Sequence, residues 1–145
     1  MTTAAYKYPF VAYDSRETIG NIITDNDCNK KTTHNGIHYI LGCSSCDEKA
    51  IIEAYDGDGL LPEELDPFEG IVVDQGTVYR VVGGEGRILK EKQRKDNHFA
   101  IGSGAMIALA AMDLGLSAKD AVKQAITRDT CTGGKVRSFN ICNGN

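Results

Sequence analysis

The strand-like and helix-like segments of this chain are grouped in blocks, and this grouping limits its architecture more than any other feature. Strand patterns and a single short helix occupy most of the first hundred residues, two consecutive helical segments follow, and one strand pattern closes the chain. Regular alternation of strand and helix would favour a parallel sheet, whereas grouped elements favour antiparallel sheet with helices packed on its outside. We therefore predict an α+β fold that forms a single domain over residues 1–145.

Turn residues and apolar periodicity divide the chain into these elements. Strands are predicted at residues 3–13 (broken at Tyr8-Pro9), 22–24, 28–32, 37–41, 71–82 (turning near Gln75-Gly76), 98–102 and 135–142. Helices are predicted at residues 47–54, 104–114 and 117–127, the last with Ser117 as its N-cap. We predict polar connections at residues 14–21, a hairpin turn at Asn35-Gly36, and a solvated loop or hairpin end at residues 90–96.

Charge and hydropathy exclude several classes of protein. The chain has 16 basic and 20 acidic residues, a net charge of −4, and no basic stripe, which argues against a nucleic-acid binder. No apolar run approaches the roughly 20 residues of a membrane span, so we expect no membrane partner. The N-terminus lacks the apolar core of a secretory signal. We therefore expect a cytoplasmic protein.

Five cysteines, an odd number, fit reduced thiols better than a disulfide framework. Cys43 and Cys46 form a C-x-x-C motif, but the sequence offers no second pair of ligands at zinc-site spacing. No βαβ pattern surrounds the motif, which argues against a thioredoxin-type redox site. We expect neither a metal nor another cofactor.

Thr2 follows the initiator methionine directly and is a candidate nucleophile. If Met1 is removed, Thr2 presents a hydroxyl next to a free α-amine, whose pKa near 8 allows it to accept the hydroxyl proton. A threonine at the second position is common, however, and by itself carries no functional information.

Five other residues each fit a catalytic or a structural interpretation. Lys30 could lower the pKa of a nearby amine or protect an exposed strand edge, and the Gly42 N–H could be an oxyanion donor or part of a tight turn. Ser103 could relay a proton or cap the following helix. Asp129 and Thr132, in the stretch Arg-Asp-Thr-Cys-Thr-Gly-Gly, could bind an adjacent N-terminus or end a helix.

The order of these signals is more specific than any one of them. Thr2-Thr3, Asp14, Gly20-Asn21, Lys30, Gly42, Ala100-Ile-Gly-Ser-Gly-Ala and Arg128-Asp-Thr-Cys-Thr-Gly-Gly occur in this order. The sequence resembles the proteasome β-subunit and HslV peptidase family of N-terminal nucleophile hydrolases over nearly its whole length. The last stretch is similar to the family pattern Arg-Asp-Ser-x-Ser-Gly-Gly, with Thr130 and Thr132 keeping the hydroxyls.

The resemblance implies a role for each of these residues. Thr2 would attack a carbonyl carbon and form an acyl-enzyme, with its own amine as general base. Lys30, paired with Asp14, would lower the pKa of that amine, and the Gly42 N–H would stabilise the oxyanion. The remaining residues would orient the N-terminus; they are Ser103, Asp129 and Thr132.

The resemblance also implies a four-layer αββα sandwich, self-association into a ring or smaller homo-oligomer, and an ATP-dependent unfoldase as partner. Residues 43–70 leave room for only part of one helical layer, so we expect that layer to be shortened. Three functions remain open: a threonine peptidase, a catalytically silent relative that serves as a binding or assembly module, and an amide hydrolase of small metabolites. The silent relative would suit a phage-encoded protein in its host's cytoplasm, and the peptidase a bacterial cytoplasmic protein.

Overall fold

The structure, a computed structural model that describes residues 2–143, has an α+β fold, as predicted. It divides into two compact units, one made of residues 1–30 and 94–145 and the other of residues 31–93. No helix within residues 2–143 has both the length and the apolar character needed to cross a bilayer.

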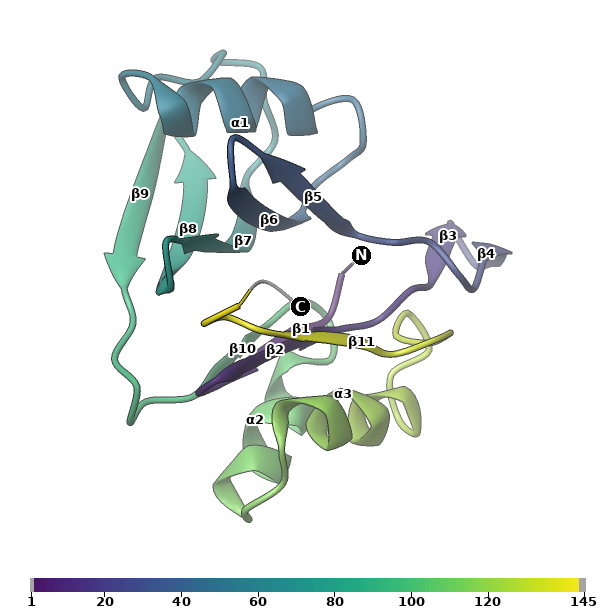
Figure 1. The fold of residues 1–145 in the computed structure, drawn as a ribbon. Helices are drawn as coiled ribbons and strands as arrows, with labels where there is room; N and C mark the ends of the chain where they lie inside the picture. Colours follow the sequence, from purple (N-terminus) through teal and green to yellow (C-terminus); the bar gives the residue numbers. More distant parts are fainter. Residues whose placement is uncertain (1, 144–145) are drawn as a thin grey trace. The chain divides into compact units, whose positions relative to one another are not determined.

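An antiparallel sheet of four strands forms the centre of the first unit (Figure 1). Its order is β10 (Phe99–Ile101), β1 (Ala4–Lys7), β2 (Phe10–Tyr13), β11 (Arg137–Asn140). Strands β1 and β2 form a hairpin around Tyr8-Pro9, where the sequence predicts the break. Residues from both ends of the chain thus meet in this sheet, with Arg137 opposite Tyr13 in register.

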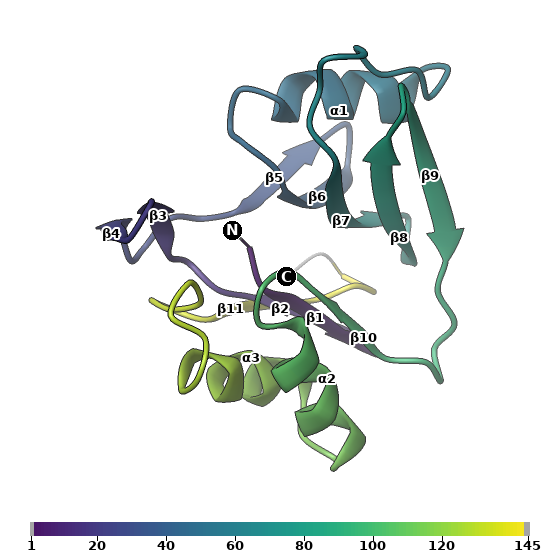
Figure 2. The same cartoon turned by 180° about the vertical axis from the view of Figure 1, so that it is seen from behind.

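Two helices, α2 (Ala105–Asp113) and α3 (Ala118–Ile126), pack on one face of this sheet, as Figure 2 shows from behind. Small side chains allow the close approach: Ala5 and Ala12 of the sheet pack with Ala121 and Ala125 of α3. Ser117 caps α3 as predicted, because its side chain accepts the Asp120 N–H at 3.1 Å.

Two predictions for residues 14–32 are partly wrong. The connection at residues 14–21 contains a strand, β3 (Glu17–Ile19), which pairs with β4 (Ile22–Asp25). Gly20 adopts a φ of +59°, which allows the tight turn between them. The strand predicted at residues 28–32 begins only at Lys31, because Cys28 donates its N–H to the Ser15 carbonyl oxygen instead of to a strand ladder.

The second unit holds an antiparallel sheet of five strands in sequence order. They are β5 (Lys31–His34), β6 (Ile37–Gly42), β7 (Phe68–Asp74), β8 (Thr77–Gly84) and β9 (Arg87–Lys92). The predicted turns at Asn35-Gly36 and Gln75-Gly76 are confirmed, with positive φ at all four residues. The charged run that begins at Lys90 is not all loop, because its first three residues belong to β9.

A single helix, α1 (Glu48–Asp56), lies between β6 and β7 in sequence and packs on one face of the second sheet. Its buried residues Ile51 and Ile52 contact Tyr39, Leu41 and Val72 of the sheet in one apolar cluster. The segment between these strands thus supplies one helix, as its length predicts.

Candidate active site

A buried ion pair joins Asp14 and Lys30. The Lys30 Nζ lies 2.8 Å from the Asp14 Oδ1, and the two side chains are 8% and 0% exposed. Asp14 follows β2 directly, and Lys30 lies at the end of the irregular segment after β4. A buried charge pair requires good geometry and further hydrogen bonds to offset its desolvation.

The Asp14 carboxylate has those further hydrogen bonds. The Thr3 N–H donates to Oδ1 at 3.1 Å, and the Gly133 N–H donates to Oδ2 at 3.1 Å. The Asp14 N–H in turn donates to the Thr3 carbonyl oxygen. Asp14 therefore fixes the backbone of the N-terminal segment and of the loop after α3, as well as the Lys30 ammonium.

A second carboxylate, Asp129, gathers three hydrogen bonds. Ser103 donates its hydroxyl to Asp129 Oδ2 at 2.5 Å, Thr132 donates its hydroxyl to the same oxygen, and the Cys131 N–H donates to Oδ1 at 3.2 Å. Burial raises the pKa of Asp129, but these hydrogen bonds outweigh burial and lower its pKa overall. Ser103 serves this contact and does not cap α2, whose N-cap is Gly104.

Thr3 connects the two carboxylates, a role that the sequence does not reveal. The hydroxyls of Thr3 and Thr132 lie 2.7 Å apart, and the Gly104 N–H donates to the Thr3 hydroxyl at 3.0 Å. Because Thr132 gives its only hydroxyl proton to Asp129, Thr3 must donate to Thr132. Both the hydroxyl and the backbone of Thr3 are thus committed to holding the N-terminal segment in place.

Two glycines let the backbone approach these threonines. Gly102 has a φ of +92°, and a Cβ there would lie 1.7 Å from the Thr2 carbonyl oxygen. A Cβ at Gly104 would lie 2.9 Å from the hydroxyl oxygens of both Thr3 and Thr132. The Gly-Ser-Gly stretch of the sequence therefore serves close packing around the N-terminal segment.

The structure brings six of the seven predicted site residues into the first unit: Thr2, Asp14, Lys30, Ser103, Asp129 and Thr132. Thr2 is 7% exposed and precedes the fixed Thr3, while Met1 lies outside the described residues. Gly42, the seventh, ends β6 in the second unit, where a Cβ would lie 3.0 Å from the Glu69 carbonyl oxygen. This explains a glycine at that position, and its oxyanion role stays a prediction.

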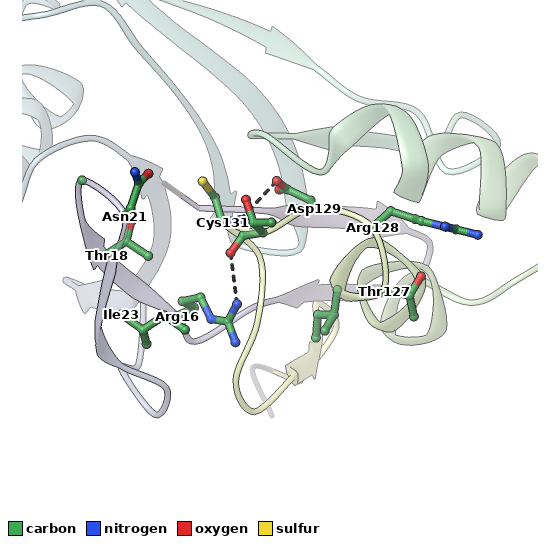
Figure 3. Close-up of a pocket in the computed structure, with 11 residues that line it drawn as sticks. Arg16, Thr18, Asn21, Ile23, Thr127, Arg128, Asp129 and Cys131 are labelled. Carbon is green, nitrogen blue, oxygen red and sulfur yellow. Dashed lines mark hydrogen bonds between the residues drawn. The ribbon is translucent and has the colours of Figure 1, made fainter.

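A pocket of about 540 Å³ borders Asp129 (Figure 3). It lies between the β3–β4 hairpin, represented by Thr18, Asn21 and Ile23, and the loop that follows α3. Arg16 donates to the Thr130 carbonyl oxygen of that loop at 3.0 Å. Arg16 therefore ties this loop to the segment before β3, and the pocket borders the loop at Asp129.

The cysteines of the C-x-x-C motif differ in environment. All five cysteines are free thiols. Burial raises the pKa of Cys43 to about 12, and nearby carboxylates add to the effect, whereas Cys46 is exposed. Across residues 2–143, His, Cys, Asp and Glu form no group of three that could hold a metal ion.

No protein-family model and no curated protein matches the sequence. Solved structures do match. The Thiobacillus denitrificans protein BPH superposes with a TM-score of 0.66 at 17% identity, covering 95% of both chains. This chain shares the fold of BPH. BPH in complex with epoxomicin gives a TM-score of 0.67 at 17% identity, covering 95% of this chain and 96% of BPH.

Proposed function

We propose that this protein is an N-terminal threonine hydrolase, a peptidase of the proteasome and HslV type that acts through Thr2 once Met1 is removed. One observation carries the proposal: two carboxylates from distant parts of the chain hold Thr3 in place. Asp14 accepts the Thr3 N–H directly, and Asp129 acts through the Thr132 hydroxyl, which contacts the Thr3 hydroxyl. A residue held through both its backbone and its hydroxyl fixes the residue before it, and catalysis gains most from such fixed geometry.

The proposed reaction uses groups of the processed N-terminus. The Thr2 hydroxyl loses its proton to the free α-amine while its oxygen attacks the substrate carbonyl carbon. The amine passes that proton to the leaving nitrogen as the amide bond breaks, which leaves an ester on Thr2. Water then hydrolyses the ester. The Lys30 ammonium supplies positive charge that lowers the pKa of the amine, and we assign the Gly42 N–H to the oxyanion.

We also propose the four-layer αββα sandwich with one helical layer shortened. Its support is that helices cover one face of each sheet, with only α1 on the second, and that the fold matches BPH. Successive side chains of β1 and β2 point to opposite faces of the sheet. Ala5 and Ala12 face the helices, and Tyr6 and Val11 point away from them. Because Tyr6 and Val11 are also buried, they support a second covered face.

Self-association is part of the proposal, with an ATP-dependent unfoldase as the partner that delivers substrate. Helix α2 has no charged residue before Asp113, and Met106 on it and Leu114 at its C-cap are 78% and 84% exposed. A helix that is apolar on all sides is normally buried, so these exposed side chains support a contact with a second copy. The free thiols support the cytoplasm as the compartment.

The test combines intact mass with peptide hydrolysis. We expect protein from its natural host to lack Met1 and to cleave short fluorogenic peptides. Thr2→Ala should abolish turnover, whereas Thr2→Ser should retain part of it because it keeps the hydroxyl and the amine. Epoxomicin, which BPH binds, is a suitable first inhibitor. Retention of Met1, or full activity in Thr2→Ala, would contradict the proposal, and a processed protein without activity would favour the silent relative.

A further inference from the structure

We infer that Arg137 is the positioning residue for Lys30. The effect of Arg137 on catalysis rests on the proposed function, whereas its effect on the position of Lys30 rests only on contacts within the first unit. Lys30 lies in no helix or strand. Strand β4 ends at Asp25 and β5 begins at Lys31, so the residues between them lack the ladder hydrogen bonds that fix a strand.

Arg137 binds the backbone of this irregular segment. Its Nη2 donates to the Asp27 carbonyl oxygen at 3.3 Å and to the Asp27 Oδ1 at 2.7 Å. Its Nη1 donates to the Cys28 carbonyl oxygen at 3.4 Å. One guanidinium thus holds two consecutive residues, the second of which lies two positions before Lys30.

The same guanidinium reaches the chain next to Asp14. Arg137 lies on β11 opposite Tyr13, and its Nη1 also donates to the Ser15 hydroxyl. Arg137 therefore binds Ser15, which follows Asp14, and also Asp27 and Cys28, which precede Lys30. It contacts neither member of the ion pair in these bonds, so its role is to bring the two segments together.

Two neighbouring side chains also bind this irregular segment. Tyr13 donates its hydroxyl to Asn29 Oδ1 at 3.0 Å, and Arg16 donates to Asn26 Oδ1 at 3.0 Å. Among these three side chains, Arg137 is the one that binds backbone carbonyls of the segment. Its bonds act together with two backbone bonds, from the Cys28 N–H to the Ser15 carbonyl oxygen and from the Lys135 N–H to the Asn26 carbonyl oxygen.

The ion pair between Arg137 and Asp27 is not the main effect. The Asp27 side chain is 72% exposed and that of Arg137 21% exposed, and such pairs add little to stability. For holding the segment, the number and direction of the N–H donors of Arg137 matter more than its charge. A guanidinium presents five N–H groups in a rigid plane, whereas a lysine ammonium is a single point that cannot reach all four acceptors.

The catalytic consequence concerns the general base. A Lys30 that leaves its place next to Asp14 supplies less positive charge to the Thr2 amine, so the pKa of that amine rises. Because the amine must be neutral to accept a proton, the acid limb of the kcat/KM profile then moves to higher pH, with KM little changed.

The test measures the position of Lys30 directly, by the rate of its acetylation in the folded full-length protein, read by peptide mass spectrometry. We expect Lys30 to react at least about fivefold faster in Arg137→Met and Arg137→Lys than in the wild type, since local opening exposes its amine. Arg94→Met is the matched control, because Arg94 pairs with Asp96 on the surface. Exposed Lys119 serves as an internal reference.

Each outcome decides the inference. Equal protection of Lys30 in the wild type and in both Arg137 variants overturns it, whether or not the protein cleaves peptides. If Arg137→Met unfolds, Arg137→Lys decides, because it keeps the charge and most of the aliphatic chain. Faster acetylation together with a shift of the pH profile supports the whole account. Faster acetylation in a protein whose wild type has no Thr2-dependent activity supports the positioning role and refutes the proposed function alone.

Discussion

Replacing Lys30 by methionine should leave the Asp14 carboxylate buried without the ammonium that neutralises it. Asp14 is fully buried, and within residues 2–143 it keeps two backbone donors, the Thr3 and Gly133 N–H groups. Removing one partner of a buried pair costs about 3–5 kcal/mol of unfolding free energy. Because the two N–H groups still stabilise the charge, we expect a value near the lower end, about 3 kcal/mol.

The reverse variant, Asp14→Asn, removes the charge that faces Lys30 and keeps one of the two accepting oxygens. We expect a similar loss of about 3 kcal/mol. In the double variant neither charge remains to be desolvated alone. The combined loss should therefore fall short of the sum of the single losses by about 2 kcal/mol, within the range of coupling energies for residues in contact.

Urea unfolding at neutral pH, followed by circular dichroism, gives all four free energies of this cycle. Lys119→Met is the matched control, since Lys119 is exposed on α3 and its substitution should change stability by less than about 0.5 kcal/mol. Additive losses, with a coupling energy below about 0.5 kcal/mol, would refute the reasoning that Asp14 and Lys30 stabilise each other in the folded chain.

Three further predictions concern other parts of the site and the chain. Hydrogen bonds hold the pKa of Asp129 below its ordinary value. The ionised Asp129 therefore stabilises the fold above the unfolded pKa of about 3.9, and this stabilisation is lost as the pH falls. The difference in unfolding free energy between wild type and Asp129→Asn should shrink when urea titrations are repeated at acid pH. Gly102→Ala should lower Tm more than Gly115→Ala, because both have positive φ but only at Gly102 would a Cβ clash, 1.7 Å from a carbonyl oxygen; equal Tm values would contradict this. Iodoacetamide at pH 8 should modify Cys46 well before Cys43, whose pKa is raised to about 12; equal rates in peptide mass spectra would speak against the burial of Cys43.

Local sequence signals predict the elements whose cause is local. The turns at Asn35-Gly36 and Gln75-Gly76 need positive φ, and the cap at Ser117 needs a side-chain acceptor, so the residues themselves indicate the structure. The sequence does not predict strand β3, because most of its residues are polar and resemble a loop, and because the strand depends on pairing with β4.

The candidate site depends on contacts that no local pattern encodes. The sequence itself indicates Lys30 as a candidate and the family resemblance adds Asp14, but only the structure places them 2.8 Å apart. The sequence does not predict the role of Thr3, because that role lies in hydrogen bonds to residues more than a hundred positions away. Arg137 also gave no signal, since an arginine in a strand pattern is ordinary unless its acceptors are known.

The most direct test of Thr2 as nucleophile is to trap the acyl-enzyme. Protein that lacks Met1 is mixed with a peptide ester or amide substrate, quenched in acid within the first turnover, and digested for mass spectrometry. We predict a mass increase equal to the acyl part of the substrate on the peptide that begins with Thr2, and none in Thr2→Ala. Turnover without such an adduct, or an adduct on any other residue, would contradict the central claim.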